Sequence, residues 1–371
     1  MGIDMDEPNA RPGGASRKIK WLGIAVGAVL VLYTGVWAFL ASQLESGTET
    51  AIAQAAAEGT QIVCEDADAR GYPFRLGLHC AATGLATPEG ASVTAGSFRS
   101  AAQIYDPGLV ISEIDGPLAV EAPGTRIEAS WDVARASTRF GTERLNDGRL
   151  NVTDVDVSAT LDGAPFAARV ARVFGTIRPN EGDLDAALTI DDLDVAPLEG
   201  RDAPPVDLFL DATLTGAASA LAYDAPPLES LRGRELRLRS LDVALAGGGR
   251  IEVAGAVAVD GSGAANGTIE VAFSDIAATI DTLAALVPEM EGPLRTAGGL
   301  LGGSAGGGLL AGFLGGGSDG AGGTADGNGT ADDGTAGDGE RADAMTRATI
   351  TIADGQARVG IIPLGRVPLL P

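Results

Sequence analysis

An uncharged run of twenty residues, Trp21 to Leu40, constrains this chain more than any other feature of its sequence. At about 1.5 Å of rise per residue, a helix of this length spans the roughly 30 Å hydrocarbon core of a bilayer. Aromatic rings lie toward both ends of the run, and such rings favour the membrane interface. We therefore predict a transmembrane anchor over residues 21–40.

Basic residues before the run give the anchor a predicted direction. Arg17, Lys18 and Lys20 lie in the tail of residues 1–20, directly ahead of Trp21. Positive charge stays on the cytoplasmic side, so the tail is predicted to be cytoplasmic and the rest of the chain exported. A cleaved signal peptide and a buried core helix are the alternatives. The run is, however, longer than the apolar stretch of about 7–15 residues in a signal peptide.

Residues 41–59 are predicted to continue the helix beyond the membrane as a stalk. They are rich in alanine, their apolar side chains favour one helical face, and Gly59 can cap the end. The whole chain has 50 acidic and 26 basic residues, and both lysines lie in the tail, so the part beyond the tail is strongly acidic. Such a body repels a phosphate backbone, which excludes nucleic acid as a partner.

The chain has two cysteines, Cys64 and Cys80, on either side of a distinctive string. The string consists of Gly71, Tyr72, Pro73, Phe74 and Arg75. An exported compartment lets the cysteines oxidise, so we predict a structural disulfide across a hairpin that has this string at its turn. A redox or metal pair is the alternative, but no Cys-x-x-Cys spacing occurs. The single histidine, His79, cannot complete a zinc site, and we predict a solvated strand histidine.

Residues 60–297 are predicted to form a β domain, because short segments of alternating polarity recur along them. Asp162-Gly163 and Asp260-Gly261 are typical hairpin turns. One helix is predicted over residues 276–287. The fold class is therefore mainly β: an N-terminal helix with its extension, then a long curved antiparallel sheet or a sandwich with one or two helices.

The alternation slips by one residue between Val152 and Val155, and again between Ile190 and Leu193. A slip of this kind indicates a β-bulge, although a strand end followed by a turn fits equally well.

Residues 298–345 are dominated by glycine and are predicted to form a flexible insertion. A calcium-binding Gly/Asp repeat is the alternative, but the tract lacks a nonapeptide period. Residues 346–371, with an Asp354-Gly355 turn, are predicted to be C-terminal strands that complete the β domain.

Three features together resemble the bacterial domain-of-unknown-function family 2125. They are the anchor, the Gly71–Arg75 string between paired cysteines, and the Asp354-Gly355 hairpin followed by Ile362-Pro363-Leu364-Gly365. The resemblance implies a Gram-negative inner-membrane protein with a periplasmic domain. The predicted anchor makes it single-pass, with a cytoplasmic N-terminus. It supplies no activity and no catalytic residue. At fold level alone, an anchor followed by a strand ladder is similar to AsmA-type envelope proteins, whose sheets suit lipid chains.

No P-loop, Gly-x-Ser-x-Gly string or histidine-rich cluster occurs, so we expect no enzyme, cofactor or metal site. The leading hypothesis is a non-enzymatic envelope protein whose sheet offers an apolar groove to lipid or to an envelope protein. The alternative is a scaffolding envelope protein with a closed β core that binds protein partners.

Overall fold

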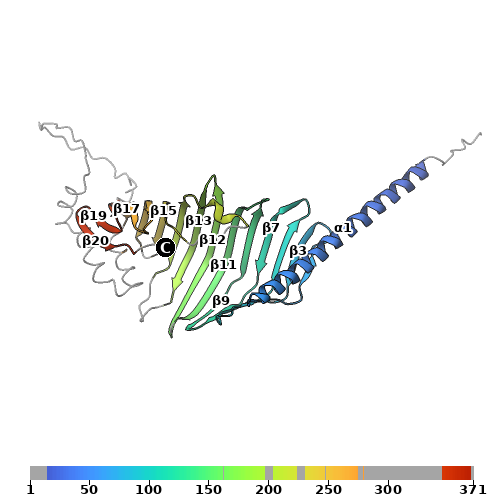
Figure 1. Ribbon diagram of the computed structural model, residues 1–371, viewed down its shortest axis with the longest axis horizontal. Coiled ribbons are helices and arrows are strands. Elements are labelled where there is room, and N and C mark those ends of the chain that lie inside the picture. Colours follow the sequence, from blue (N-terminus) through green and yellow to red (C-terminus); the bar gives the residue numbers. More distant parts are fainter. Residues whose placement is uncertain are drawn as a thin grey trace, which may run out of the picture.

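The computed structural model describes residues 15–161, 163–196, 204–223, 230–246, 248–274, 279 and 345–368. Within them, one long helix is followed by a single antiparallel sheet (Figure 1). The predicted mainly β fold class is confirmed. Of the two expected arrangements, the described residues form the long curved sheet.

Helix α1 spans Ala15–Ala57 without a break, so the predicted anchor and stalk are one helix. At its end the N–H of Gly59 donates to the carbonyl of Ala56 at 3.1 Å, and that of Thr60 donates to Ala55 at 2.9 Å. These two bonds form a Schellman motif, which needs a left-handed residue, and Gly59 has a φ of 91°. The predicted cap is confirmed.

The first half of the sheet consists of long strands that are each broken in two. Their bounds are β1 Gln61–Cys64, β2 Asp68–Arg70, β3 Arg75–Cys80, β4 Thr83–Ala86, β5 Ser92–Ala95, β6 Phe98–Gln103, β7 Asp106–Ile114, β8 Leu118–Ala122, β9 Thr125–Ser130 and β10 Val133–Phe140. In one half of this part of the sheet the strands pair in the order β2, β3, β6, β7, β10. In the other half they pair in the order β1, β4, β5, β8, β9. Both series of pairings end on β11, so they are two halves of one meander.

The strands of the second half are β11 Leu145–Leu161, β12 Ala164–Asn180, β13 Asp183–Val195, β14 Val206–Leu214, β15 Glu235–Leu245, β16 Arg250–Val259, β17 Ala265–Phe273, β18 Thr346–Ala353, β19 Gln356–Val359 and β20 Ile362–Arg366. Each pairs with the next. A short 3-10 helix, η1 Ala218–Leu221, lies between β14 and β15. Strands β17 and β18 are direct neighbours although residues 274–345 separate them in the chain.

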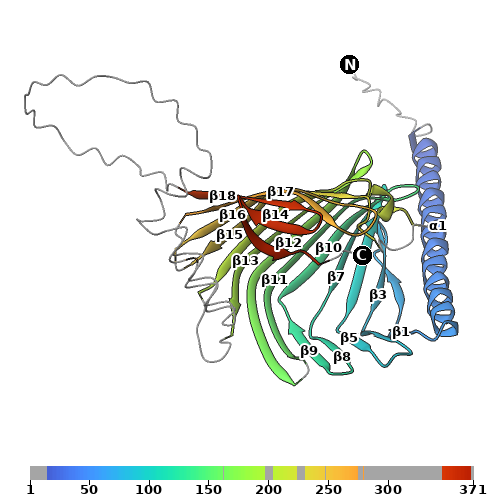
Figure 2. The same cartoon turned by 60° about the vertical axis from the view of Figure 1, so that its left-hand side comes forward.

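The breaks in the first strands line up as one crease across the sheet. Backbone hydrogen bonds join neighbouring breaks: Glu65 N–H to Ala82, and Gly96 N–H to Asp115, both at 3.0 Å. The crease continues into the longer strands at Asp154 and Asp192, whose φ angles are 53° and 51°. Irregularities of this kind bend a sheet, and the strands curve along their length in Figure 2.

The two predicted slips are the last members of this crease. Between Ile190 and Leu193 the register of β13 against β14 shifts by one residue, which confirms a bulge. Between Val152 and Val155 the irregularity is the left-handed Asp154, with no shift in the pairing of β11 with β12.

One predicted pairing is wrong. The strand that forms a hairpin with β3 is β2, whereas β1, which carries Cys64, pairs with β4. The physical reason is a turn after Cys64, in which Asp66 adopts a φ of 50° and separates β1 from β2. The helix predicted over 276–287 and the insertion over 298–345 lie outside the described residues, apart from helical Thr279 and Met345.

Candidate functional site

Cys64 and Cys80 form a disulfide that joins β1 to β3, with their Cα atoms 5.0 Å apart. The predicted bond is confirmed, and Cys80 is only 2% exposed. His79 is more enclosed than predicted. Its side chain is 23% exposed, and its Nδ1 lies 3.6 Å from Asp68 Oδ1. Within the described residues neither of these two atoms has a hydrogen-bond partner.

The string Gly71–Arg75 forms the turn between β2 and β3 and docks against α1. Arg75 N–H closes the turn on the Gly71 carbonyl at 2.9 Å. From α1, the Tyr33 hydroxyl donates to the Pro73 carbonyl, and Trp37 Nε1 donates to the Arg75 carbonyl at 2.9 Å. This contact was not predicted from the sequence, although Tyr33 and Trp37 are one helical turn apart on the same face.

Tyr72 extends the contact between the turn and α1. Its hydroxyl lies 2.8 Å from Thr34 Oγ1, and its ring lies edge-on to Trp37 with centroids 5.4 Å apart. Further along α1, Glu45 Oε1 accepts the N–H of Ala69 in β2 at 2.9 Å. The helix is therefore fixed to the first hairpin by both side chains and backbone.

The sheet has two faces of opposite character, and antiparallel partners place their side chains on the same face. We call one face the apolar face. Its central positions are Val155, Val157, Val170, Val173, Leu188, Ile190, Leu208, Leu210, Leu241, Val243, Ile251, Val253, Ile269, Val271, Ile350 and Ile352. From β7 to β18 no Asp, Glu, Lys, Arg or His occupies a paired position on this face.

A row of small and aliphatic side chains crosses the apolar face from β12 to β18. Its members, in register, are Gly175, Leu188, Leu210, Leu241, Val253, Val271 and Ala348. Most large side chains on the face are only partly buried. Leu150 is 44% exposed, Leu161 45% and Leu236 46%. An apolar surface of this kind usually marks an interaction site or a ligand groove.

The opposite face, which we call the charged face, carries arginine and carboxylate pairs between neighbouring strands. Arg169 contacts Asp156 at 2.6 Å, and Arg172 contacts Asp191 at 2.7 Å. Arg99 contacts both Glu113 and Asp115, at 2.7 and 2.8 Å. Hydrogen bonds from Arg99 and Arg135 lower the pKa of Glu113 below its ordinary value of 4.5.

The most enclosed charges on this face surround Asp185, whose exposed fraction is 4%. Its Oδ1 accepts from Thr213 Oγ1 at 2.7 Å and from Arg239 Nη1 at 3.0 Å, while Arg178 contacts Oδ2 at 3.3 Å. A register shift in β15 next to Arg239 lets the guanidinium contact Asp211 as well. Burial raises the pKa of Asp185, but hydrogen bonds from Thr213 and Arg239 outweigh it, so the pKa lies below its ordinary value.

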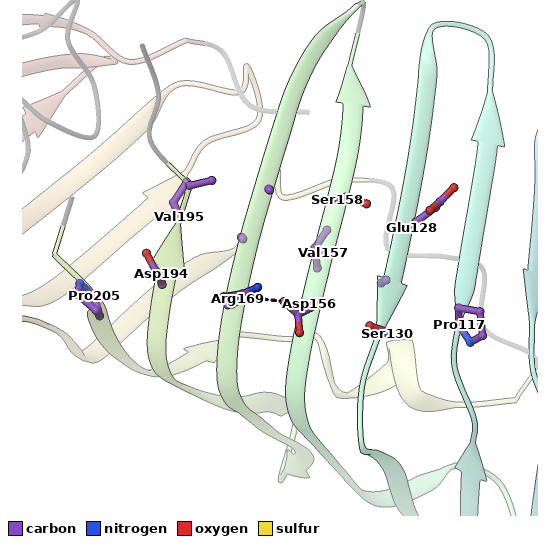
Figure 3. Close-up of a pocket in the computed structure, with 14 residues that line it drawn as sticks. Pro117, Glu128, Ser130, Asp156, Val157, Ser158, Arg169, Asp194, Val195 and Pro205 are labelled. Atoms are coloured by element: carbon purple, nitrogen blue, oxygen red, sulfur yellow. Dashed lines mark hydrogen bonds and ion pairs between the residues drawn. The ribbon is translucent and has the colours of Figure 1, made fainter. Parts of the chain in front are cut away.

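A hollow of about 790 Å³ lies beside the crease and is lined mainly by β9, β11, β12 and the end of β13. Figure 3 shows the Arg169–Asp156 pair in it, with Asp194, Glu128 and Ser158 nearby. Its charged side chains are solvated or already paired, and the part of the chain that the structure describes holds no group of three or more His, Cys, Asp or Glu side chains able to bind a metal ion.

Helix α1 is long and apolar enough over Lys18–Ala57 to cross a membrane, with a mean hydropathy of 2.2 in its most apolar stretch. A signal sequence near an N-terminus has the same properties. Only 6% of that stretch is buried against the rest of the protein, unlike the core helix of a soluble domain.

One family model matches the chain, over residues 37–313, and its description is "Uncharacterized protein conserved in bacteria (DUF2125)". The match covers Trp37, both cysteines and the sheet through β17, whereas the Asp354-Gly355 hairpin lies beyond it. No curated protein and no solved structure matches the chain, so the similarity to AsmA-type proteins has no support from these comparisons. Because the model covers most of its length, the chain belongs to this family.

Proposed function

We propose that this member of the DUF2125 family is a non-enzymatic protein of the bacterial inner membrane, anchored by α1, whose apolar face holds lipid acyl chains. The observation that carries the proposal is the absence of charged side chains from the paired positions of the apolar face between β7 and β18. An apolar face that is partly open to solvent has a free-energy cost unless a ligand or partner covers it, at about 25 cal/mol per Å².

The dimensions of the apolar face support an acyl ligand. The row from Gly175 to Ala348 crosses seven strands, and a spacing of about 4.8 Å between neighbours gives it a length of about 29 Å. One leaflet of a bilayer contributes about half of a 30 Å hydrocarbon core. The row is therefore long enough to accommodate one fully extended acyl chain, or two acyl chains laid end to end.

The proposed location of the protein is supported by α1 and by the disulfide. Lys18 and Lys20 precede the apolar segment, which favours a cytoplasmic N-terminus. The Cys64–Cys80 disulfide favours an oxidising compartment for the sheet, which in bacteria is the periplasm. Both arguments support the proposal that the sheet lies beside the outer leaflet of the inner membrane, within reach of lipid.

The alternative, a scaffold with a closed β core, has less support. A closed core needs a second layer, and the described strands form one sheet. Large side chains on the apolar face also remain between 38% and 46% exposed at Ile177, Leu150 and Leu236.

The experiment measures how much phosphatidylethanolamine and phosphatidylglycerol the full chain retains after detergent washing, by native mass spectrometry. A double variant, Leu150→Ser with Leu236→Ser, reduces the apolar face at two exposed positions. Its matched control, Phe174→Ser with Phe209→Ser, removes side chains of 38% and 40% exposure from the charged face.

We expect the first double variant to lose bound lipid several-fold while the control retains it. Lipid around α1 is common to all three proteins and cancels in the comparison. Equal retention by all three would overturn the proposed lipid-binding role.

A further inference from the structure

We propose that the edge of the sheet containing the β2–β3 and β6–β7 turns is inserted into the interface of the same membrane that α1 crosses. The proposal rests on the membrane-anchoring part of the proposed function. It assigns a second membrane contact, in which the side chains of Tyr72, Phe74 and Tyr105 lie in the phospholipid interface.

The first observation is the level at which the β2–β3 turn meets α1. Tyr33 and Trp37, which bond to its carbonyls, lie within the uncharged run of residues 21–40. Tyr33 precedes Leu40 by seven residues, or about 10 Å of helix. A helix that spans the bilayer therefore carries this turn to the outer boundary of the membrane.

The second observation is that the turn's backbone suits a dry environment. In lipid, a carbonyl without a partner costs several kcal/mol, so carbonyls bonded within the protein favour such a site. The carbonyls of Gly71, Pro73, Phe74 and Arg75 all accept hydrogen bonds, two of them from α1 side chains. The donor to Phe74 is the N–H of Ile104 at 3.1 Å, which fixes the β6–β7 turn beside the β2–β3 turn.

The third observation is the exposure of aromatic rings along this edge. Tyr105 is 77% exposed, Phe74 68% and Tyr72 51%. The same edge carries the β10–β11 turn, where the Phe140 ring lies 6.3 Å from that of Tyr223. Exposed tyrosine and phenylalanine rings at one level are typical of the membrane–water interface.

The opposite edge of the sheet provides an internal comparison. Its described turn residues, 58–60, 87–91, 123–124, 163, 196, 204–205, 246, 248–249, 274 and 345, include no aromatic side chain. The aromatic rings therefore lie on the edge that adjoins the apolar part of α1. Strands β2, β3, β6, β7 and β10 then each begin or end at the membrane, and the rows of the apolar face, which cross the strands, run along it.

Depth-dependent quenching tests the proposal in the full chain. Single cysteines are introduced as Phe74→Cys, Tyr105→Cys, Val26→Cys and Glu89→Cys and labelled with an environment-sensitive fluorophore, with the native disulfide kept oxidised. The proteins are reconstituted in phosphatidylethanolamine and phosphatidylglycerol vesicles that contain phosphatidylcholine with brominated acyl chains. All four side chains are exposed, so the labels leave the packing intact.

We expect bromine to quench the labels at positions 74 and 105 strongly, and to leave the label at 89, on the opposite edge, unquenched. Quenching at 26 without quenching at 74 and 105 would overturn this inference and leave the anchor in place. Quenching of 89 to the same extent as 74 and 105 would also overturn it. A label at 26 that is not quenched would overturn the anchor, and the inference with it.

Discussion

The two faces of the sheet are built from the same strands, yet one carries aliphatic side chains and the other carries ion pairs. On the apolar face, Leu241, Val253 and Val271 occupy successive paired positions across three strands and leave a partly open hydrocarbon surface. On the charged face, cross-strand ion pairs such as Arg172–Asp191 occupy the equivalent positions. The charged face keeps its side of the sheet hydrated, whereas the proposed function assigns the apolar face to lipid.

The largest effect is expected where a charge is placed on the apolar face. In the variant Val253→Asp a carboxylate lies between Leu241 and Val271, with no cation at a paired position on that face from β7 to β18. Burying such a charge should lower the free energy of unfolding by about 2–4 kcal/mol. Chemical denaturation of the full chain in detergent measures it.

The control for this variant lies on the same strand. In Ala256→Asp the new carboxylate lies on the charged face between Arg237 and Thr268, and we expect a change within about 0.5 kcal/mol. Equal losses in the two variants would show that the faces are not energetically distinct.

A smaller loss of stability is expected within the charged face, where some ion pairs are buried and others are exposed to solvent. The variant Arg239→Met leaves the carboxylate of Asp185, 4% exposed, without its main cationic partner. We expect a loss of about 1–3 kcal/mol in the free energy of unfolding. Arg169→Met breaks a solvated pair with Asp156 and should leave the melting temperature unchanged. An equal fall in both melting temperatures would contradict this ranking.

The smallest effect is the pH dependence, which should arise from the charged face alone. The folded protein holds the pKa of Glu113 below its ordinary value of 4.5, because Arg99 and Arg135 donate hydrogen bonds to it. Its contribution to stability is therefore present above that value and is lost as pH falls through the lower folded pKa. In the variant Glu113→Gln, the free energy of unfolding should fall less steeply as the pH is lowered from neutral to acidic. An unchanged dependence on pH would show that Glu113 does not contribute to it.

Local sequence signals predicted much of this architecture. Alternating polarity identified the strands and their apolar residues, and Gly59 marked the helix end, because both depend on neighbours in the chain. The slip between Ile190 and Leu193 was visible for the same reason. The disulfide followed from the predicted compartment and from the pairing of only two cysteines.

Long-range features could not be predicted in this way. The pairing of β1 with β4 depends on the left-handed backbone of Asp66, and an aspartate in a sequence does not by itself indicate that conformation. The bonds from Tyr33 and Trp37 depend on where β3 lies beside α1. The Arg239–Asp185 contact joins residues 54 positions apart, and with 50 acidic side chains available the sequence could not select one partner.

Site-specific photocrosslinking tests the central claim most directly. A photoreactive phenylalanine analogue at Leu150 or Leu236 lies on the apolar face, and at Phe174 or Phe209 it lies on the charged face, with similar exposure. After irradiation in native membranes, mass spectrometry reports which positions gain the mass of a phospholipid. We expect lipid adducts at positions 150 and 236 and none at positions 174 and 209. Equal adducts on both faces, or adducts only on the charged face, would contradict it.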